Sequence, residues 1–208
     1  MKSYHSIPTC KNTKNIGNFC IAFDKMDGSN IRVEYNRKNK HSNGFIKFGT
    51  RTQLIDKNSQ FGEVLDMFMN KYSEGVSKIF KDDKLFRGAE EITLYLEYFG
   101  ENSFAGSHEE TDEKDLVLFD LFVYKKSFIQ PKNFIETFEP LGIPNVIYSG
   151  IFDNNLIKNV NDNVYNLKEG VVGKGVIDGK IWMTKIKTFD WLEKVKNKFG
   201  EKRYLEEL

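Results

Sequence analysis

The chain has 208 residues and carries 31 Lys and Arg against 30 Asp and Glu, a formal net charge of +1. This length suits one domain with a sizeable core. Near-neutrality excludes a protein that holds nucleic acid by diffuse attraction, so any phosphate binding must come from a local arrangement of cations. With 14% aromatic residues and 4 prolines, the composition also excludes disordered, collagen-like and low-complexity classes.

Cysteine content and the N-terminus bear on the compartment. Cys10 and Cys20 are too few for a disulfide framework or a zinc site, so both are expected to be free thiols in a reducing cytoplasm. The N-terminus has no apolar signal core, and no apolar run approaches membrane-spanning length. The sequence therefore predicts a cytoplasmic protein with no membrane partner. The histidines His5, His41 and His108 are expected at the surface or in loops.

In the first half of the chain, strand patterns predominate. Alternating apolar residues predict a hairpin over residues 19–37 with a charged turn at Asp27-Gly28. Apolar residues near helical spacing predict a helix over Phe61–Lys81. Leu116–Tyr124 is a nearly continuous apolar run, typical of a strand covered on both faces. Further strands are expected at Gly44–Arg51 and Ile92–Tyr98.

The second half mixes helices with short strands. Helices are expected at Pro131–Leu141, Leu156–Tyr165 and Phe189–Leu208, the last despite Gly200. Strands are expected at Val146–Ile151, and as a final pair formed by Val171-Val172 and Ile181–Thr188. Neither a linker nor a repeat interrupts the chain. The pattern predicts a single α+β domain over residues 1–208, built on antiparallel sheets with flanking helices.

The segment Lys25-Met26-Asp27-Gly28-Ser29-Asn30 carries the sharpest chemical signal. A lysine at the end of an apolar strand can lie in a partly desolvated site, which favours the neutral, nucleophilic amine. Asp27 would orient that amine or hold a metal-bound water, and Gly28 would allow a ligand to approach the backbone closely. Taken alone, however, the segment is more typical of a hairpin turn with a solvated lysine and aspartate.

Two glutamates add to this signal. Glu97 points to the strand face opposite Leu94 and Leu96, where it would hydrogen-bond sugar hydroxyls or, as an edge-strand residue, face water. Glu169 directly precedes a glycine and an apolar strand, so it would hold the water shell of a divalent cation or lie in a solvated turn.

Lys185 and Lys187 are two residues apart on a predicted strand and therefore share one face. Two ammonium groups side by side are costly unless an anion lies between them, and a phosphate is the anion expected. The alternative is an exposed basic edge strand, which protects against aggregation.

Five segments appear in order: Lys-x-Asp-Gly-x-Asn from Lys25, Leu-Tyr-Leu-Glu-Tyr-Phe-Gly around Glu97, Leu-Phe-Asp around Phe119, Glu-Gly-Val-Val-x-Lys from Glu169, and Lys-x-Lys at 185–187. They resemble motifs I, III, IIIa, IV and V of the covalent nucleotidyltransferases, which are the ATP-dependent DNA and RNA ligases and the mRNA-capping enzymes. Asn30 and the N-terminal Tyr4-His5-Ser6-Ile7-Pro8 resemble the nick-sealing phage RNA ligases. The resemblance implies the nucleotidyltransferase (ATP-grasp-like ligase) fold.

The resemblance also implies a reaction. Lys25 would attack the α-phosphorus of ATP, expel pyrophosphate and carry AMP to a 5′-phosphate RNA end, which a 3′-hydroxyl then attacks. Lys185 and Lys187 match the lysines that contact the α-phosphate. Asp27 and Glu169 match carboxylates that organise Mg²⁺ or Mn²⁺ through water. Asp24 lies directly before the expected nucleophile, and it too is expected to bind the nucleotide.

The remaining implied roles concern the nucleoside and the RNA ends. Glu97 matches the ribose contact, and Phe119 matches the aromatic that stacks on adenine, although core packing beside Phe122 would also explain it. Arg51 matches an arginine near the nucleotide sugar or the reacting ends, and Asn30 would help to position those ends. The RNA partner would be a pair of ends, in a nicked duplex or an RNA/DNA hybrid.

Only 21 residues follow Lys187, whereas a domain typically needs about 50. The expectation is therefore a core without the OB-fold or helical accessory domain that related ligases append. How the substrate is captured is left open, and a partner protein that replaces the domain is one answer. The oligomeric state is left open. Alternatives are a small ATP-dependent DNA ligase, a guanylyltransferase that takes GTP, or a non-catalytic homologue that binds nucleotides or RNA ends.

Overall fold

The computed structural model describes residues 2–101 and 103–208, and it folds into two compact units, each built from segments that are distant in the sequence. One unit contains Ser29–Tyr98, Lys114–Ile143 and the N-terminal residues up to Tyr4; we call it the five-stranded unit. The other contains His5–Gly28, Phe99–Glu113 and Pro144–Leu208; we call it the four-stranded unit. Antiparallel pairing with flanking helices confirms the predicted α+β class. No helix in the described part of the chain is long and apolar enough to cross a membrane.

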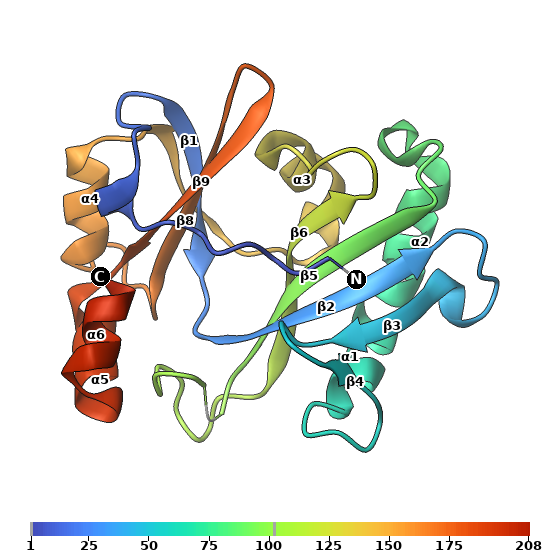
Figure 1. Cartoon of the computed structure of the whole chain (residues 1–208), viewed down its shortest axis with the longest axis horizontal. Helices are drawn as coiled ribbons and strands as arrows, with labels where there is room; N and C mark the ends of the chain where they lie inside the picture. Colours follow the sequence, from blue (N-terminus) through green and yellow to red (C-terminus); the bar gives the residue numbers. More distant parts are fainter. Residues whose placement is uncertain (1, 102) are drawn as a thin grey trace. The chain divides into compact units, whose positions relative to one another are not determined.

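The five-stranded unit is a sheet of order β4-β3-β2-β5-β6 with helices packed on it (Figure 1). Its core is aromatic: Phe80 packs on Tyr35 and on Phe86, with ring centroids 4.9 and 4.7 Å apart. Its strands are β2 (Gly28–Asn36), β3 (Phe45–Gly49), β4 (Leu54–Ile55), β5 (Glu91–Phe99) and β6 (Asp115–Val123); its helices are α1 (Glu63–Lys71), α2 (Ser73–Asp82) and α3 (Pro131–Phe138), with 3-10 turns at Ser42–Gly44, Lys84–Phe86 and Glu139–Leu141.

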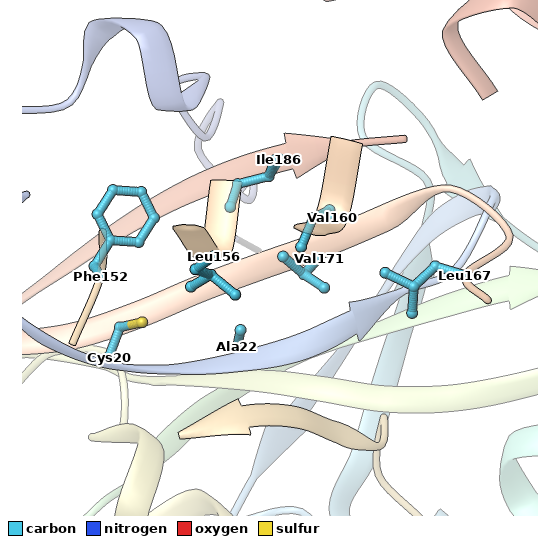
Figure 2. Packing of buried hydrophobic residues seen from close by; sticks show 8 residues of the cluster. All are labelled: Cys20, Ala22, Phe152, Leu156, Val160, Leu167, Val171 and Ile186. Atoms are coloured by element: carbon cyan, nitrogen blue, oxygen red, sulfur yellow. The ribbon is translucent and has the colours of Figure 1, made fainter. Parts of the chain in front are cut away.

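The four-stranded unit is an antiparallel sheet of order β7-β1-β8-β9. Figure 2 shows the apolar core on one face of this sheet, where Leu156 and Val160 of α4 approach Ala22 and Val171. Its strands are β1 (Phe19–Lys25), β7 (Val146–Ile151), β8 (Gly170–Ile177) and β9 (Lys180–Lys187); its helices are α4 (Asn154–Asn161), α5 (Phe189–Phe199) and α6 (Glu201–Glu207), with a 3-10 turn at Cys10–Asn12.

The predicted hairpin over residues 19–37 is wrong. β1 bonds to β7 and β8, whereas β2 belongs to the other sheet and lies between β3 and β5. Because both edges of each strand are already hydrogen-bonded, β1 and β2 cannot pair with each other. The turn at Asp27-Gly28 therefore carries the chain from one sheet to the next.

Two predicted long helices are each divided in two. The helix expected over Phe61–Lys81 breaks at Tyr72, whose backbone leaves helical angles (φ −120°, ψ −30°) while its hydroxyl bonds the backbone of Leu118 and Gly142. The helix expected over Phe189–Leu208 breaks at Gly200, which adopts a left-handed φ of 85° between α5 and α6. The other predicted elements are confirmed in type, but some ends differ: the strand predicted at Val171-Val172 runs from Gly170 to Ile177, and the helix predicted to end at Tyr165 ends at Asn161. Cys10 and Cys20 are free, as predicted.

Candidate active site

Lys25, Glu169 and Lys187 meet where three strands of the four-stranded unit come together. In the sheet register, Gly170 of β8 is opposite Lys25 of β1 on one side and opposite Lys187 of β9 on the other. The Lys25 ammonium lies 2.8 Å from Oε2 of Glu169, and the Lys187 ammonium lies 3.9 Å from Oε1 of the same carboxylate. Three residues that the sequence marked separately therefore form one cluster.

The end of β9 is fixed by backbone contacts on both sides. Asn161 of α4 donates to the carbonyl of Lys187 at 2.7 Å, and the amide of Thr188 donates to the carbonyl of Glu169 at 2.9 Å. The Thr188 hydroxyl then caps α5 by accepting from the amide of Trp191 at 3.1 Å. The Lys187 ammonium lies 4.1 Å above the Trp191 ring, a cation–π contact.

Burial is the largest influence on the pKa values of Glu169 and Lys187, whose side chains are each only 4% exposed. Burial raises the pKa of the Glu169 carboxyl above its ordinary value, although the charges of Lys25 and Lys187 oppose the shift. Burial likewise lowers the pKa of Lys187 to about 8, against the attraction of Glu169. The Lys25 side chain keeps 24% of its surface exposed, so the nucleophile candidate can be reached from outside.

Lys185 shares the β9 face of Lys187, as the strand period predicted, and an anion lies against both ammonium groups. That anion is the carboxylate of Glu207 in α6, a residue that the sequence analysis did not single out. Burial raises the pKa of Glu207, but hydrogen bonding to Lys187 and the charges of Lys185 and Arg203 outweigh it, so the pKa lies below its ordinary value. The only sequence signal was indirect, namely that two neighbouring lysines need a counter-charge.

Asp27 is buried, with 1% of its surface exposed, and it anchors a loop. Its Oδ2 accepts hydrogen bonds from the backbone amides of Ala105 and Ser107 at 2.8 and 3.3 Å. These amides belong to the segment between β5 and β6, which no sequence pattern linked to Asp27. The contact shows a positioning role that was not expected for this carboxylate.

Asp27→Ala is expected to release this loop. Two buried amides lose their acceptor, which costs on the order of 1–3 kcal/mol of unfolding free energy. Hydrogen–deuterium exchange at residues 103–107 should therefore rise in Asp27→Ala. Asp27→Asn keeps an acceptor oxygen and should leave the exchange near the wild-type level; equal protection in the alanine variant would contradict the anchoring role.

Asp24 and His108 are two further polar residues of this unit, each with a buried polar atom. Oδ1 of Asp24 and Nε2 of His108 are both buried with no hydrogen-bond partner in the described structure. Burial raises the pKa of the Asp24 carboxyl, and the charge interaction with His108 opposes the shift. His108 is in a loop, in line with the prediction of a surface or loop position; its side chain is only 8% exposed, and its Nδ1 lies 3.0 Å from Asp112. His5 and His41 are exposed, as predicted.

Glu97 and Phe119 belong to the five-stranded unit, on β5 and β6. Glu97 is half-buried and Leu94 and Leu96 are fully buried, but Tyr95 on the Glu97 face is fully buried as well, so burial along β5 does not alternate. Phe119 is also half-buried and packs against Tyr4 edge-on at 5.1 Å and against Tyr95 at 6.5 Å. Core packing is thus part of what Phe119 does, and its contact with adenine stays a prediction.

Arg51 and Asn30 belong to the same unit. Arg51 is exposed in a bend, which Arg32 supports by donating from Nε to the carbonyl of Thr50 at 2.7 Å. Oδ1 of Asn30 is buried and has no hydrogen-bond partner among the described residues. The roles of both residues toward RNA ends stay predictions.

A divalent cation can be tested against these carboxylates. Among the described residues, no group of three or more His, Cys, Asp or Glu side chains could hold a metal ion. Asp27 and Glu169 are already engaged with amides and lysines. This donor set does not fit an all-protein cage, but it fits Mg²⁺ or Mn²⁺ bound mainly by water and substrate phosphates beside one carboxylate.

The scaffold is an antiparallel α+β fold, and on it a strand-end lysine pairs with a buried glutamate beside a second strand that has two lysines on one face. Such a group of ammonium ions has the chemistry to bind phosphate. A family model described as RNA ligase matches residues 19–186, which is most of the chain. The chain therefore belongs to the RNA ligase family. A search of curated proteins finds no significant match.

Solved structures of the Naegleria gruberi RNA ligase have a similar fold. A point mutant of that ligase with ATP and Mn is 21% identical, with a TM-score of 0.63 over 95% of this chain. An apo point mutant is 22% identical, with a TM-score of 0.63 over 94% of this chain. The ligase with pyrophosphate is 20% identical, with a TM-score of 0.60 over 95%. This chain spans only 58–59% of those ligase chains.

Proposed function

We propose that this chain is the nucleotidyl-transfer core of an ATP-dependent RNA ligase, and that Lys25 becomes covalently bound to AMP. The observation that carries the proposal is the geometry of Lys25, whose ammonium lies 2.8 Å from the buried Glu169 carboxylate, with Lys187 on the other side of that carboxylate. The family supports it, and the Naegleria ligase with a similar fold was solved with ATP and Mn.

In the proposed first step, the Lys25 amine forms a bond to the α-phosphorus, and the bond to the bridging oxygen breaks. Pyrophosphate leaves with that electron pair. The ion pair holds Lys25 as an ammonium ion, which is not a nucleophile, so a proton must leave first. Glu169 lies within hydrogen-bond distance, and burial raises the pKa of its carboxyl, so it is placed to receive that proton.

Lys185 and Lys187 would neutralise charge on the phosphates as the transition state forms, because phosphoryl transfer depends mainly on positioning and electrostatics. Glu169 is the carboxylate that would hold a divalent cation through water, and that ion would neutralise further phosphate charge. We assign Asp24 to nucleotide binding because its buried Oδ1 has no partner.

In the later steps AMP would pass to a 5′-phosphate RNA end, and a 3′-hydroxyl would attack it. We assign the ribose to Glu97, the base to Phe119, and the RNA ends to Arg51 and Asn30. The assignment of Arg51 is supported by its exposed position. The assignment of Asn30 is supported by its buried Oδ1, which has no hydrogen-bond partner among the described residues. A net charge of +1 indicates weak unaided binding of RNA, so a partner that captures RNA is part of the proposal.

The proposal is tested by incubating the protein with α-labelled ATP and Mg²⁺. We expect a covalent label that is stable to alkali and lost in acid, as a phosphoramidate is, and that maps to the peptide containing Lys25. Labelled GTP should not substitute. A label on another residue, or none on protein whose fold is verified by circular dichroism, would contradict the proposal. Nicked RNA, RNA/DNA and DNA duplexes compared side by side then identify the preferred ends.

A further inference from the structure

The carboxylate of Glu207 is surrounded by three cations. Its Oε2 contacts the ammonium of Lys187 and lies 3.5 Å from that of Lys185. Its Oε1 lies 2.7 Å from the guanidinium of Arg203, one turn earlier in α6. The Glu207 side chain is only 12% exposed, so this carboxylate is held inside the cluster.

This arrangement has the chemistry of a filled anion site. Lys187 is nearly buried and Lys185 is 19% exposed, so both ammonium groups have lost much of their hydration. Without an anion beside them, charges this close would be costly to keep. A carboxylate and a phosphate both present oxygens that accept charge-assisted hydrogen bonds from lysine and arginine. Glu207 thus occupies the position that a phosphate oxygen would take on these two lysines.

The element that carries Glu207 has little apolar packing. α6 has seven residues and contains no fully buried residue. It follows Gly200, and among the described residues Tyr204 and Leu208 pack, partly buried, on the small cluster formed by Ala105, Trp191, Leu192 and Val195, while Glu201 pairs with Lys196 and Arg203 lies over the Phe104 ring. A helix this short is marginal on its own, so the ion pairs of Glu207 are a main part of what holds α6 in place, and a phosphate on the same lysines would replace them.

We propose that Glu207 is a displaceable internal anion, which occupies the phosphate site of Lys185 and Lys187 until a phosphate-bearing substrate replaces it and α6 detaches. The inference rests on the proposed function, because that function makes these lysines the phosphate contacts. Glu207 then competes with the nucleotide. The protein without nucleotide keeps Lys185 and Lys187 neutralised, and the apparent affinity for phosphate falls by the fraction of molecules in which Glu207 is bound.

The test compares Glu207→Gln with Glu206→Gln, its neighbour in the sequence. Glu206 pairs with Arg203 at 2.9 Å and its side chain is 49% exposed, so its variant is a matched control. The probe is inorganic pyrophosphate, whose binding needs neither a nucleobase nor catalysis, and calorimetry measures it. We expect Glu207→Gln to bind pyrophosphate about fivefold to tenfold more tightly than wild type, and Glu206→Gln to match wild type. Equal or weaker binding by Glu207→Gln would overturn the inference.

A second measurement uses the unmodified protein and so does not depend on how the variants fold. Hydrogen–deuterium exchange at residues 201–207 should rise when saturating pyrophosphate is added, because α6 leaves the sheet. Unchanged or slower exchange at saturation would overturn the inference. Both readouts are independent of AMP transfer. If wild-type protein binds pyrophosphate in this way but takes no AMP label, the proposed function is contradicted, whereas the proposal that Glu207 is a displaceable anion is not.

Discussion

Lys25→Ala is expected to abolish covalent AMP labelling, because the variant has no amine at the strand end to attack the α-phosphorus. It should also lose stability, since Glu169 is left with Lys187 at 3.9 Å as its remaining cation in the cluster. Breaking a fully buried pair costs roughly 3–5 kcal/mol. Lys25 is a quarter exposed, so water screens part of this interaction and we expect a loss of about 1–2 kcal/mol.

Lys25→Arg separates the two effects. The guanidinium keeps a permanent positive charge beside Glu169, so stability in urea should recover, whereas labelling should stay absent because arginine is not deprotonated in proteins. Lys180→Ala, an exposed residue at the start of β9, serves as the matched control and should label like wild type. Labelling of Lys25→Ala at the wild-type rate would exclude Lys25 as the nucleophile.

Gly170→Ala is expected to have the largest effect on folding. A Cβ atom there would lie 2.1 Å from the carbonyl oxygen of Ile186 and 2.8 Å from the Cα of Lys187. Both are backbone atoms, so β8 and β9 must separate at the point where the register joins Lys25, Gly170 and Lys187. We expect a loss of about 3 kcal/mol in unfolding free energy, measured by denaturant titration, and loss of labelling.

Gly173→Ala, three residues along the same strand, controls for the loss of a glycine. Its added Cβ would lie 3.5 Å from the Cγ2 of Thr184, an ordinary contact. The change in stability should stay within about 1 kcal/mol. Equal stability of Gly170→Ala and Gly173→Ala would contradict the requirement for close approach of β8 and β9 at Gly170.

The sequence predicted more of the site than of the strand pairing. The period of a strand is local, so it placed Lys185 and Lys187 on one face without knowledge of their neighbours. The order of the motifs, from Lys25 to Lys187, likewise identified the nucleotidyltransferase class. Pairing is not local: the apolar pattern of β1 and β2 fits a hairpin equally well, and only competition from β7, β8, β3 and β5 decides against it.

The tertiary structure alone decided which charges meet. Asp27 accepts from a loop about eighty residues away, and Glu207 returns to β9 from a helix that follows the break at Gly200. The His108 side chain is only 8% exposed, packs on the Phe99 ring and pairs with Asp112, which a single histidine in a loop sequence does not indicate. Side-chain faces follow from backbone geometry within one element. Which carboxylate neutralises which lysine instead depends on long-range packing, and that is the information that motifs and periodicity do not carry.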